Sequence, residues 1–215
     1  MKKVSKNVII FLIIMTVLAF TNLIKLEMNG ETVKPAGLMV FLGVAAFFIT
    51  RKTNDSKNEG LDIKKFPGQL KSIKVILLIL VPTILDFLTI SLEKKFLPEV
   101  LEHIEGRITF IDKSQVIITV ISLVVLALGE EIALRAFFQK QSTKLIGFIP
   151  SLIVTSLVFS FGHFSYDEPL IVVIDLVEIF INSIFYGLVF KETDNAYCSW
   201  LSHFLANVAG IFLFL

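Results

Sequence analysis

Apolar residues along this chain gather into seven runs separated by polar connections. The runs cover residues 8–24, 36–50, 75–91, 115–138, 146–164, 170–190 and 200–215. A helix that crosses a bilayer needs about 20 apolar residues, or slightly fewer where flanking side chains reach the interface. The run at 36–50 is short for this purpose. The pattern predicts an all-α fold, a polytopic transmembrane helix bundle of about seven spans.

The first run follows a lysine-rich tail, which is also how a secretory signal peptide begins. No small-residue cleavage site interrupts this run before Lys25, so we expect an uncleaved first membrane helix. No internal repeat of about 20–50 residues is visible. We therefore predict a single membrane domain over residues 1–215.

Basic residues are distributed unevenly among the connections. The N-terminal tail carries three lysines, and the connection 51–74 holds seven basic residues against three acidic ones. The connection 92–114 holds four basic residues against five acidic ones. Because connections rich in lysine and arginine stay in the cytoplasm, this alternation predicts an N-inside orientation and, with seven spans, an external C-terminus. Residues 92–114 also mix apolar and charged positions, which predicts an amphipathic helix at the interface.

The composition narrows the class of protein. Of 215 residues, 55% are hydrophobic and 18% are charged, against roughly 25% charged in a typical soluble domain. This excludes a disordered chain, a nucleic-acid-binding arm and an ordinary cytosolic enzyme. The net charge of +1 gives no electrostatic case for a nucleic-acid partner. Cys198 is the only cysteine, so no internal disulfide can form.

Three charged residues interrupt the fourth run: Glu130, Glu131 and Arg135. Each such residue costs about 2.5–3.5 kcal/mol at the centre of a membrane helix, so each needs a partner or water. Glu131 and Arg135 are spaced i, i+4 and can pair on one face. Glu130 is rotated by about 100° from Glu131 and is left to face another group. The cluster is therefore either a structural ion pair with one acid reaching the interface, or part of a functional site.

Two histidines also fall in apolar runs. His163 lies at the end of the fifth run, where it is either an interfacial residue or a functional one. His203 and Asn207 are spaced i, i+4 in the last run, and such a pair can also be simple interhelical hydrogen bonding. A hydrolytic site needs a carboxylate that takes a proton from water, imidazoles that hold water or metal, and donors for the oxyanion. The three runs together supply these groups.

Helix lengths give an expected depth for each group. A turn near Lys144 puts Glu130 and His163 within about 7 Å of each other in depth, at about 1.5 Å per residue. His203 lies about nine residues from a turn near Asp194, and at that rise we expect it nearer the cytoplasmic face.

The same residues form three motifs in a fixed order. Residues 130–135, Glu-Glu-Ile-Ala-Leu-Arg, resemble the EExxxR motif of the CPBP family, the CAAX-protease and bacteriocin-processing proteins. Phe159 and His163 match its FxxxH motif, and His203 and Asn207 match its HxxxN motif. The matched region covers somewhat under half of the chain.

The resemblance implies an intramembrane endopeptidase built from helices, with the motif-bearing catalytic helices in residues 115–215. Carried over to this chain, it makes Glu130 the general base. Glu131 would support the site and pair with Arg135. His163 would hold the attacking water with Glu130 or ligate a metal.

The resemblance also assigns roles to the last motif and to a cofactor. His203 and Asn207 would stabilise the oxyanion or complete a metal site. The family is described as metal-dependent, which implies a metalloendopeptidase with zinc or another divalent metal on Glu130, His163 and His203. A glutamate mechanism without metal uses the same side chains, so the sequence leaves both mechanisms open.

The sixth run adds a polar stripe outside the motifs. Asp175, Glu178 and Asn182 are spaced i, i+3 and i+7 and lie on one face. One hypothesis is that the stripe lines a water-filled cavity leading to Glu130. The alternative is that it faces a polar connection or pairs with Arg135.

Two more polar residues receive structural interpretations. Asp86 stands alone in the third run and is interpreted as a packing or hydrogen-bonding residue. His103 lies in a polar connection, where it needs no special explanation.

These observations favour hydrolysis of a peptide bond in a membrane-delivered peptide or protein, with that substrate and membrane lipid as partners. The Ile-, Phe- and Lys-rich composition favours a bacterial cytoplasmic membrane, and so a role in bacteriocin or peptide processing or self-immunity rather than on prenylated proteins. The alternative is a non-catalytic membrane immunity or binding protein that sequesters a peptide or receptor, although such a module has no need for buried carboxylates. A small proton-coupled transporter is disfavoured, because paired helices broken by Gly or Pro are absent.

Overall fold

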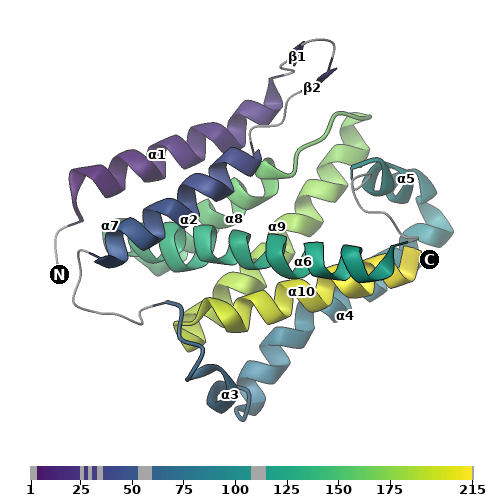
Figure 1. Cartoon of the computed structure of the whole chain (residues 1–215). Coiled ribbons are helices and arrows are strands. Elements are labelled where there is room, and N and C mark those ends of the chain that lie inside the picture. Colours follow the sequence, from purple (N-terminus) through teal and green to yellow (C-terminus); the bar gives the residue numbers. More distant parts are fainter. Residues whose placement is uncertain are drawn as a thin grey trace.

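The computed structural model describes residues 4–24, 27–28, 31–32, 36–52, 60–107 and 115–214. The helices are α1 (Lys6–Phe20), η1 (Thr21–Leu23), α2 (Ala36–Lys52), α3 (Phe66–Gln69), α4 (Ile73–Phe96), α5 (Pro98–Arg107), α6 (Val116–Glu131), η2 (Ile132–Gln139), α7 (Lys140–Ile146), α8 (Phe148–Gly162), α9 (Pro169–Thr193) and α10 (Ala196–Phe214). Two short strands, β1 (Glu27–Met28) and β2 (Glu31–Thr32), pair as an antiparallel hairpin. The predicted helical fold is confirmed, and a helix lies at each of the predicted apolar runs (Figure 1).

Within the described residues, four helical segments are long and apolar enough to cross a membrane. They are Lys6–Leu23, Ile73–Phe96, Val116–Ile146 and Pro169–Thr193. Shorter apolar helices occupy Gly37–Arg51 and Phe148–Gly162. Large apolar side chains cover the exterior, and Phe41, Ile73 and Ile117 are 73%, 70% and 77% exposed. Such a surface fits lipid rather than water, while the total of seven spans stays a prediction.

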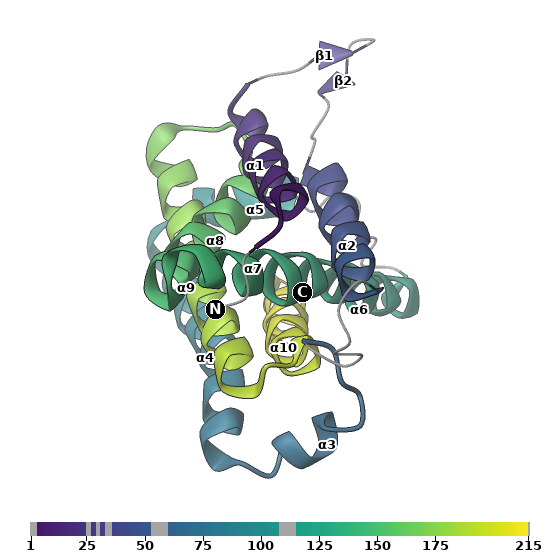
Figure 2. The same ribbon diagram turned by 90° about the vertical axis from the view of Figure 1, so that its left-hand side faces the viewer.

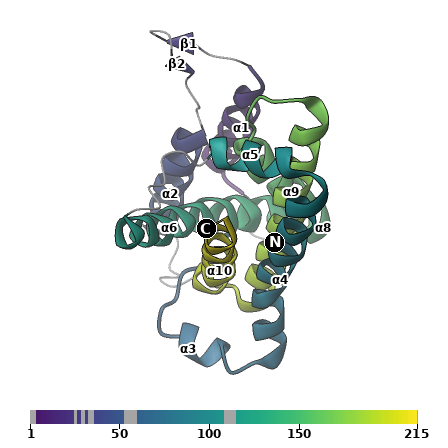
Figure 3. The same ribbon diagram turned by 90° about the vertical axis from the view of Figure 1, so that its right-hand side faces the viewer.

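The connections gather at two ends of the bundle. At one end, the Asn195 side-chain amide donates to the Asp62 carbonyl at 2.8 Å, and the Asp62 N–H donates back to Asn195 Oδ1 at 3.1 Å. At the other end, the Asn22 amide donates to the Gly162 carbonyl at 2.9 Å. The β1–β2 hairpin and α3 mark these opposite ends in every view (Figures 2 and 3). The segment before α3 and the α9–α10 turn thus share one end, as the predicted alternation of spans requires.

Hydrogen bonds from side chains to backbone fix α10 among its neighbours. Ser202 Oγ donates to the Ile79 carbonyl of α4 at 2.8 Å. Trp200 Nε1 donates to the Val124 carbonyl of α6 at 3.0 Å. Interhelical hydrogen bonds of this kind contribute about 0.6 kcal/mol each on average, so their main effect is to set the register and rotation of α10.

The segment after the two glutamates is a π-helix, η2, whereas the sequence pattern predicted an ordinary α-helix. Helix α2 packs closely against it at Gly43, where a Cβ atom would lie 2.6 Å from the Ala133 Cβ and 2.7 Å from the Met15 Cε. Stretches of π-helix are rare and are frequently found at functional sites. Here the π-helix contains Arg135 and begins directly after Glu131.

Candidate active site

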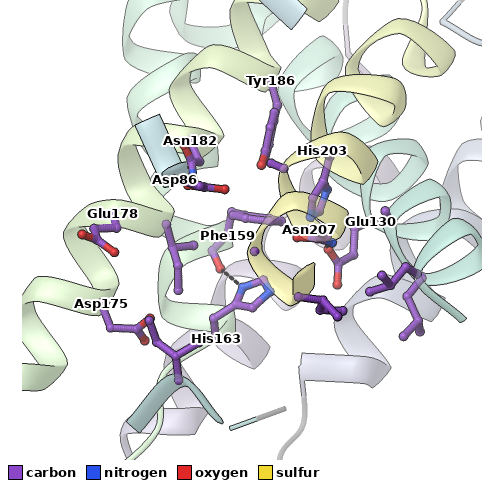
Figure 4. Close-up of a pocket in the computed structure, with 18 of the residues that line it drawn as sticks. Asp86, Glu130, Phe159, His163, Asp175, Glu178, Asn182, Tyr186, His203 and Asn207 are labelled. Atoms are coloured by element: carbon purple, nitrogen blue, oxygen red, sulfur yellow. Dashed lines mark hydrogen bonds and ion pairs between the residues drawn. The ribbon is translucent and has the colours of Figure 1, made fainter. Parts of the chain in front are cut away.

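A cavity of about 250 Å³ lies between the helices (Figure 4). Its lining comes from α4, α5, α6, α9 and α10 and from the C-terminal end of α8. The polar lining residues are Asp86, Thr89, Glu130, His163, Asp175, Glu178, Asn182, Tyr186, His203 and Asn207. Polar residues from all three sequence motifs therefore open onto one cavity.

Glu131 and Arg135 form a fully buried ion pair beside the cavity. Arg135 Nε donates to Glu131 Oε2 at 3.2 Å, and both side chains are 0% exposed. Arg135 Nη2 donates to Ser183 Oγ of α9 at 2.9 Å. The guanidinium carbon lies 5.4 Å from the ring centre of Phe159 and 5.9 Å from that of Tyr186. The pair that the i, i+4 spacing predicted is formed, and it neutralises the Glu131 carboxylate.

His203 lies between the two glutamates. Its Nδ1 is 3.1 Å from Glu131 Oε1, and its Nε2 is 3.7 Å from Glu130 Oε2. Tyr186 stacks on the imidazole with ring centres 4.7 Å apart, and Phe159 meets it edge-on at 5.5 Å. Because an ionised carboxylate only accepts hydrogen bonds, this contact assigns a proton to Nδ1. The ring is thereby held in one orientation.

Glu130 and Glu131 are adjacent in the chain but occupy different environments. The Glu130 side chain lines the cavity and is 21% exposed, whereas that of Glu131 is 0% exposed. The Glu131 carboxylate already binds Arg135 and His203. A carboxylate that reaches a cavity beside an imidazole can take a proton from water. The geometry therefore favours Glu130 over Glu131 as a base.

His163 and Asn207 complete the part of the lining that comes from the motifs. His163 Nδ1 lies 2.8 Å from the Phe159 carbonyl oxygen. Since a carbonyl only accepts, Nδ1 is the donor and Nε2 is the acceptor nitrogen of the neutral ring. Asn207 lies one helical turn after His203, and Figure 4 shows it close to Glu130 and His203. Its side-chain amide is a donor of the kind that stabilises an oxyanion.

The expected depth of His203 is wrong, because its ring lies level with the glutamates. Lys140 pairs with Asp194 at 2.7 Å, so these two residues share one level. Glu131 precedes Lys140 by nine residues, and His203 follows Asp194 by nine. Helix α7 continues beyond the level of Lys140 and Asp194 before the chain turns. Counting residues from the turn near Lys144 therefore overestimated the difference in depth between the glutamates and His203.

The polar stripe of α9 lines the cavity. Asp175, Glu178 and Asn182 all belong to the lining. The Asn182 amide donates to Asp86 Oδ1 at 2.6 Å. Asp86 thus makes the hydrogen bond that was expected of it and also faces the cavity. The stripe therefore lines the cavity that contains Glu130, as the first hypothesis predicted, and Asp175 also contacts His103 of the connection 92–114, as the alternative predicted. Arg135 pairs with Glu131 and Ser183 instead, and the filling of the cavity by water stays a prediction.

Two site residues were not predicted from the sequence. Tyr186 lines the cavity and stacks on His203. It follows Asn182 by four residues and so extends the stripe by one helical turn, which is a signal that the spacing offered. Ser183, which binds Arg135, has no such signal, because serine is common in membrane helices without any role in a site.

The interpretation of His103 as a residue of a polar connection that needs no special explanation is wrong. His103 lies on α5, the amphipathic helix predicted for this connection, and is only 6% exposed. Its Nδ1 is 2.8 Å from Asp167 Oδ2, and its Nε2 is 3.6 Å from Asp175 Oδ2. The neighbouring Ile104 lines the cavity. His103 therefore joins α5 to α9 at the edge of the site, a contact that only the packing of α5 reveals.

Glu130, His163 and His203 are the candidate metal ligands in the cavity. Among the residues that the structure describes, no group of three or more His, Cys, Asp or Glu side chains is placed to hold one. Tight zinc binding usually takes three protein ligands. Glu130 and His203 are neighbours, but His163 Nδ1 faces a backbone carbonyl. In this arrangement the three candidate ligands, Glu130, His163 and His203, do not fit a zinc site.

The chain was also compared with known proteins. Residues 112–209 match the family model for Rce1-like proteins, described as type II CAAX prenyl endopeptidase Rce1-like. No curated protein and no solved structure matches the chain. The matched residues contain all three motifs and most of the cavity lining. Residues 112–209, somewhat under half of the chain, are thus similar to the Rce1-like proteins of the CPBP family, the family that the three motifs resemble.

Proposed function

We propose that this protein is an intramembrane endopeptidase that hydrolyses a peptide bond in a membrane-delivered peptide or protein. One observation carries the proposal: Glu130, His163, His203 and Asn207, which come from three separate motifs, line one cavity in an apolar bundle. The family match supports protease activity in general. The apolar surroundings strengthen electrostatic interactions within the cavity, which favours catalysis by a few polar groups.

In the proposed reaction, Glu130 and the Nε2 atom of His163 hold a water molecule. Glu130 takes a proton from this water as its oxygen attacks the carbonyl carbon of the peptide bond. The Asn207 amide donates to the oxyanion. His203, held by Glu131 through its Nδ1–H, donates to the oxyanion from Nε2 in its doubly protonated form. Glu130 then returns the proton to the leaving amine as the C–N bond breaks.

Removal of divalent ions with a chelator distinguishes this reaction from a metal-dependent one. We expect the purified protein to keep its cleavage activity after zinc and other divalent ions are removed, because its donors are not gathered around one point. A loss of activity that added zinc restores would instead support the metal mechanism and require His163 to rotate away from the Phe159 carbonyl.

We further propose seven spans with the N-terminus inside a bacterial cytoplasmic membrane, and a role in bacteriocin or peptide processing or in self-immunity. Asp62 of the basic connection 51–74 is hydrogen-bonded to Asn195 of the α9–α10 turn, so both connections lie at the same end of the bundle. This arrangement supports the proposed topology. The lysines at positions 2 and 3 and the residues 53–59 of that connection lie outside the described residues.

The proposed activity is tested by comparing the peptides of cells that express wild type with those of cells that express Glu130→Ala. Cleavage products should be present in wild type and absent in the variant. The matched control is Glu102→Gln, an exposed glutamate of α5, which should behave as wild type. A phenotype that survives Glu130→Ala at normal expression would instead favour a non-catalytic immunity or binding protein.

A further inference from the structure

One side of the cavity is acidic. Asp86, Asp175 and Glu178 contribute carboxylates from α4 and α9, and these three residues are here named the acidic wall. Figure 4 shows Asp175 and Glu178 on the opposite side of the cavity from Glu130. Among the described lining residues there is no lysine or arginine, and the only basic ones are the two motif histidines.

A further carboxylate, Glu93, stands behind the acidic wall. It is only 4% exposed, and neither of its oxygens makes a hydrogen bond of good geometry. Its carboxyl group interacts with those of Glu178 and Asp175. Two residues of the acidic wall have partners within the protein: Asp86 accepts from Asn182, and Asp175 lies 3.6 Å from His103. Among the residues that the structure describes, the charged groups that act on Glu93 and Glu178 are other carboxyl groups.

Two adjacent carboxyl groups in an apolar interior cannot both ionise without a counter-charge. Burial removes the water that stabilises each charge, and the like charges repel. A shared proton relieves this repulsion, and so does a bound cation. Because Glu178 opens onto the cavity, a cation that enters from the substrate side can reach it.

We propose that the acidic wall binds a cationic group of the substrate, a primary ammonium or a guanidinium, while the scissile bond lies beside Glu130. The inference rests on the proposed endopeptidase function and deepens it. Both groups line the same cavity, so one bound peptide can contact both. The substrate class is then a peptide with a lysine or arginine side chain, or a free α-amino group, close to the cleaved bond.

Binding is tested first without catalysis. Purified protein in detergent is melted with n-hexylammonium or with n-hexanol at equal concentration. At about ten times its Kd, the ammonium should raise the Tm of the wild type by roughly 3 °C more than the alcohol does. Glu178→Gln should abolish this difference, and Glu102→Gln should retain it. Equal shifts for the two compounds in wild type, or an undiminished difference in Glu178→Gln, would overturn the proposal. If Glu178→Gln does not fold, Asp86→Asn provides the same comparison.

Cleavage is tested second, with peptides from the comparison of wild type and Glu130→Ala. A peptide with lysine near the cleaved bond should have a kcat/KM about tenfold higher than its norleucine analogue, a difference of about 1.4 kcal/mol. Glu178→Gln should bring the ratio of kcat/KM for the lysine and norleucine peptides close to one, whereas Glu102→Gln should keep the tenfold ratio. N-acetylated versions separate the side chain from the α-amino group as the source of the cation. Equal rates for lysine and norleucine, with and without acetylation, would overturn the proposal. If neither peptide is cleaved while hexylammonium still binds, the endopeptidase function fails and the cation site stands.

Discussion

At the scale of single residues, Glu130 and Glu131 show how surroundings assign different roles to the same side chain. Both carry the cost of a charge in an apolar helix. The ion pair with Arg135 and the contact with His203 offset that cost for the Glu131 carboxylate, whereas the Glu130 carboxylate reaches the cavity. The first glutamate of the pair is therefore suited to chemistry, and the second to holding the histidine.

The buried ion pair leads to a prediction about stability. Arg135→Met should lower the free energy of unfolding by about 3–5 kcal/mol, because it leaves Glu131 buried without its counter-charge. Adding Glu131→Gln to Arg135→Met should recover part of that loss, since the uncompensated charge is removed. The measurement is unfolding by SDS in mixed micelles. A double variant as unstable as the sum of the two single ones would show that the residues do not act as a pair.

The stacked tyrosine leads to a prediction about activity. Tyr186→Phe keeps the ring on His203 and should cleave substrate at close to the wild-type rate. Tyr186→Leu loses the aromatic contact, which is worth about 0.5–1.5 kcal/mol, and should lower kcat roughly 2- to 10-fold. Equal rates for the two variants would mean that stacking does not position His203.

At the scale of elements, the site depends on how closely the helices approach and how they are rotated. Ser202 and Trp200 fix α10, so that His203 and Asn207 face the cavity. The π-helix η2 follows Glu131 and carries Arg135 into contact with α9. Each of these contacts joins residues that are far apart in the chain.

The close approach of α2 to η2 is tested at Gly43. Gly43→Val should destabilise the protein by about 1–3 kcal/mol, because the added atoms collide with Ala133 and Met15. Gly37→Val, on the same helix, is the control, since a Cβ there meets nothing within 4 Å. Thermal unfolding of both variants in detergent gives the comparison. Similar losses at the two glycines would indicate a general helix effect rather than a packing contact.

The attachment of α5 is tested at His103. His103→Ala removes a partner from the buried Asp175 and should lower the free energy of unfolding by about 1–3 kcal/mol. Asp167→Asn, on the exposed side of the same contact, should have a smaller effect. An equal effect of the two variants would place the stabilising contact at Asp167 instead.

The same contact has a defined dependence on pH. The Glu168 backbone N–H and the His103 imidazole lower the pKa of Asp167 below its ordinary value of 3.8. A lowered pKa means that the contact stabilises the folded protein above pH 3.8 and is lost as the pH falls through the lower, folded-state value. Asp167→Asn should therefore change stability at neutral pH but not under strongly acidic conditions.

At the scale of the whole molecule, the connections separate into two ends, and the apolar exterior lies between them. The predicted orientation puts the end with α3 in the cytoplasm. In intact cells, Lys71→Cys should resist a maleimide that cannot cross membranes, and Glu99→Cys should react with it. Both positions are exposed, whereas the native Cys198 is buried and gives little background. If only Lys71→Cys were labelled, the orientation would be the opposite of the predicted one.

The sequence determined those features that depend on short spacings. Runs of apolar residues specified the positions of the helices. The i, i+4 spacing specified the Glu131–Arg135 pair, and the i, i+3, i+7 spacing specified the stripe on α9. The cost of burying polar groups singled out Glu130, His163 and His203, which line the cavity. These inferences succeed because helical periodicity and desolvation act within one or two turns.

Only the tertiary structure decided which separate elements meet and at what level. It placed His203 between the two glutamates, buried His103 against Asp175, and gathered the acidic wall from α4 and α9. These outcomes depend on helix tilt, the π-helical turn and contacts such as that of Lys140 with Asp194. No periodicity encodes them, because they join residues from different helices whose relative depth is fixed by packing rather than by the length of the connections.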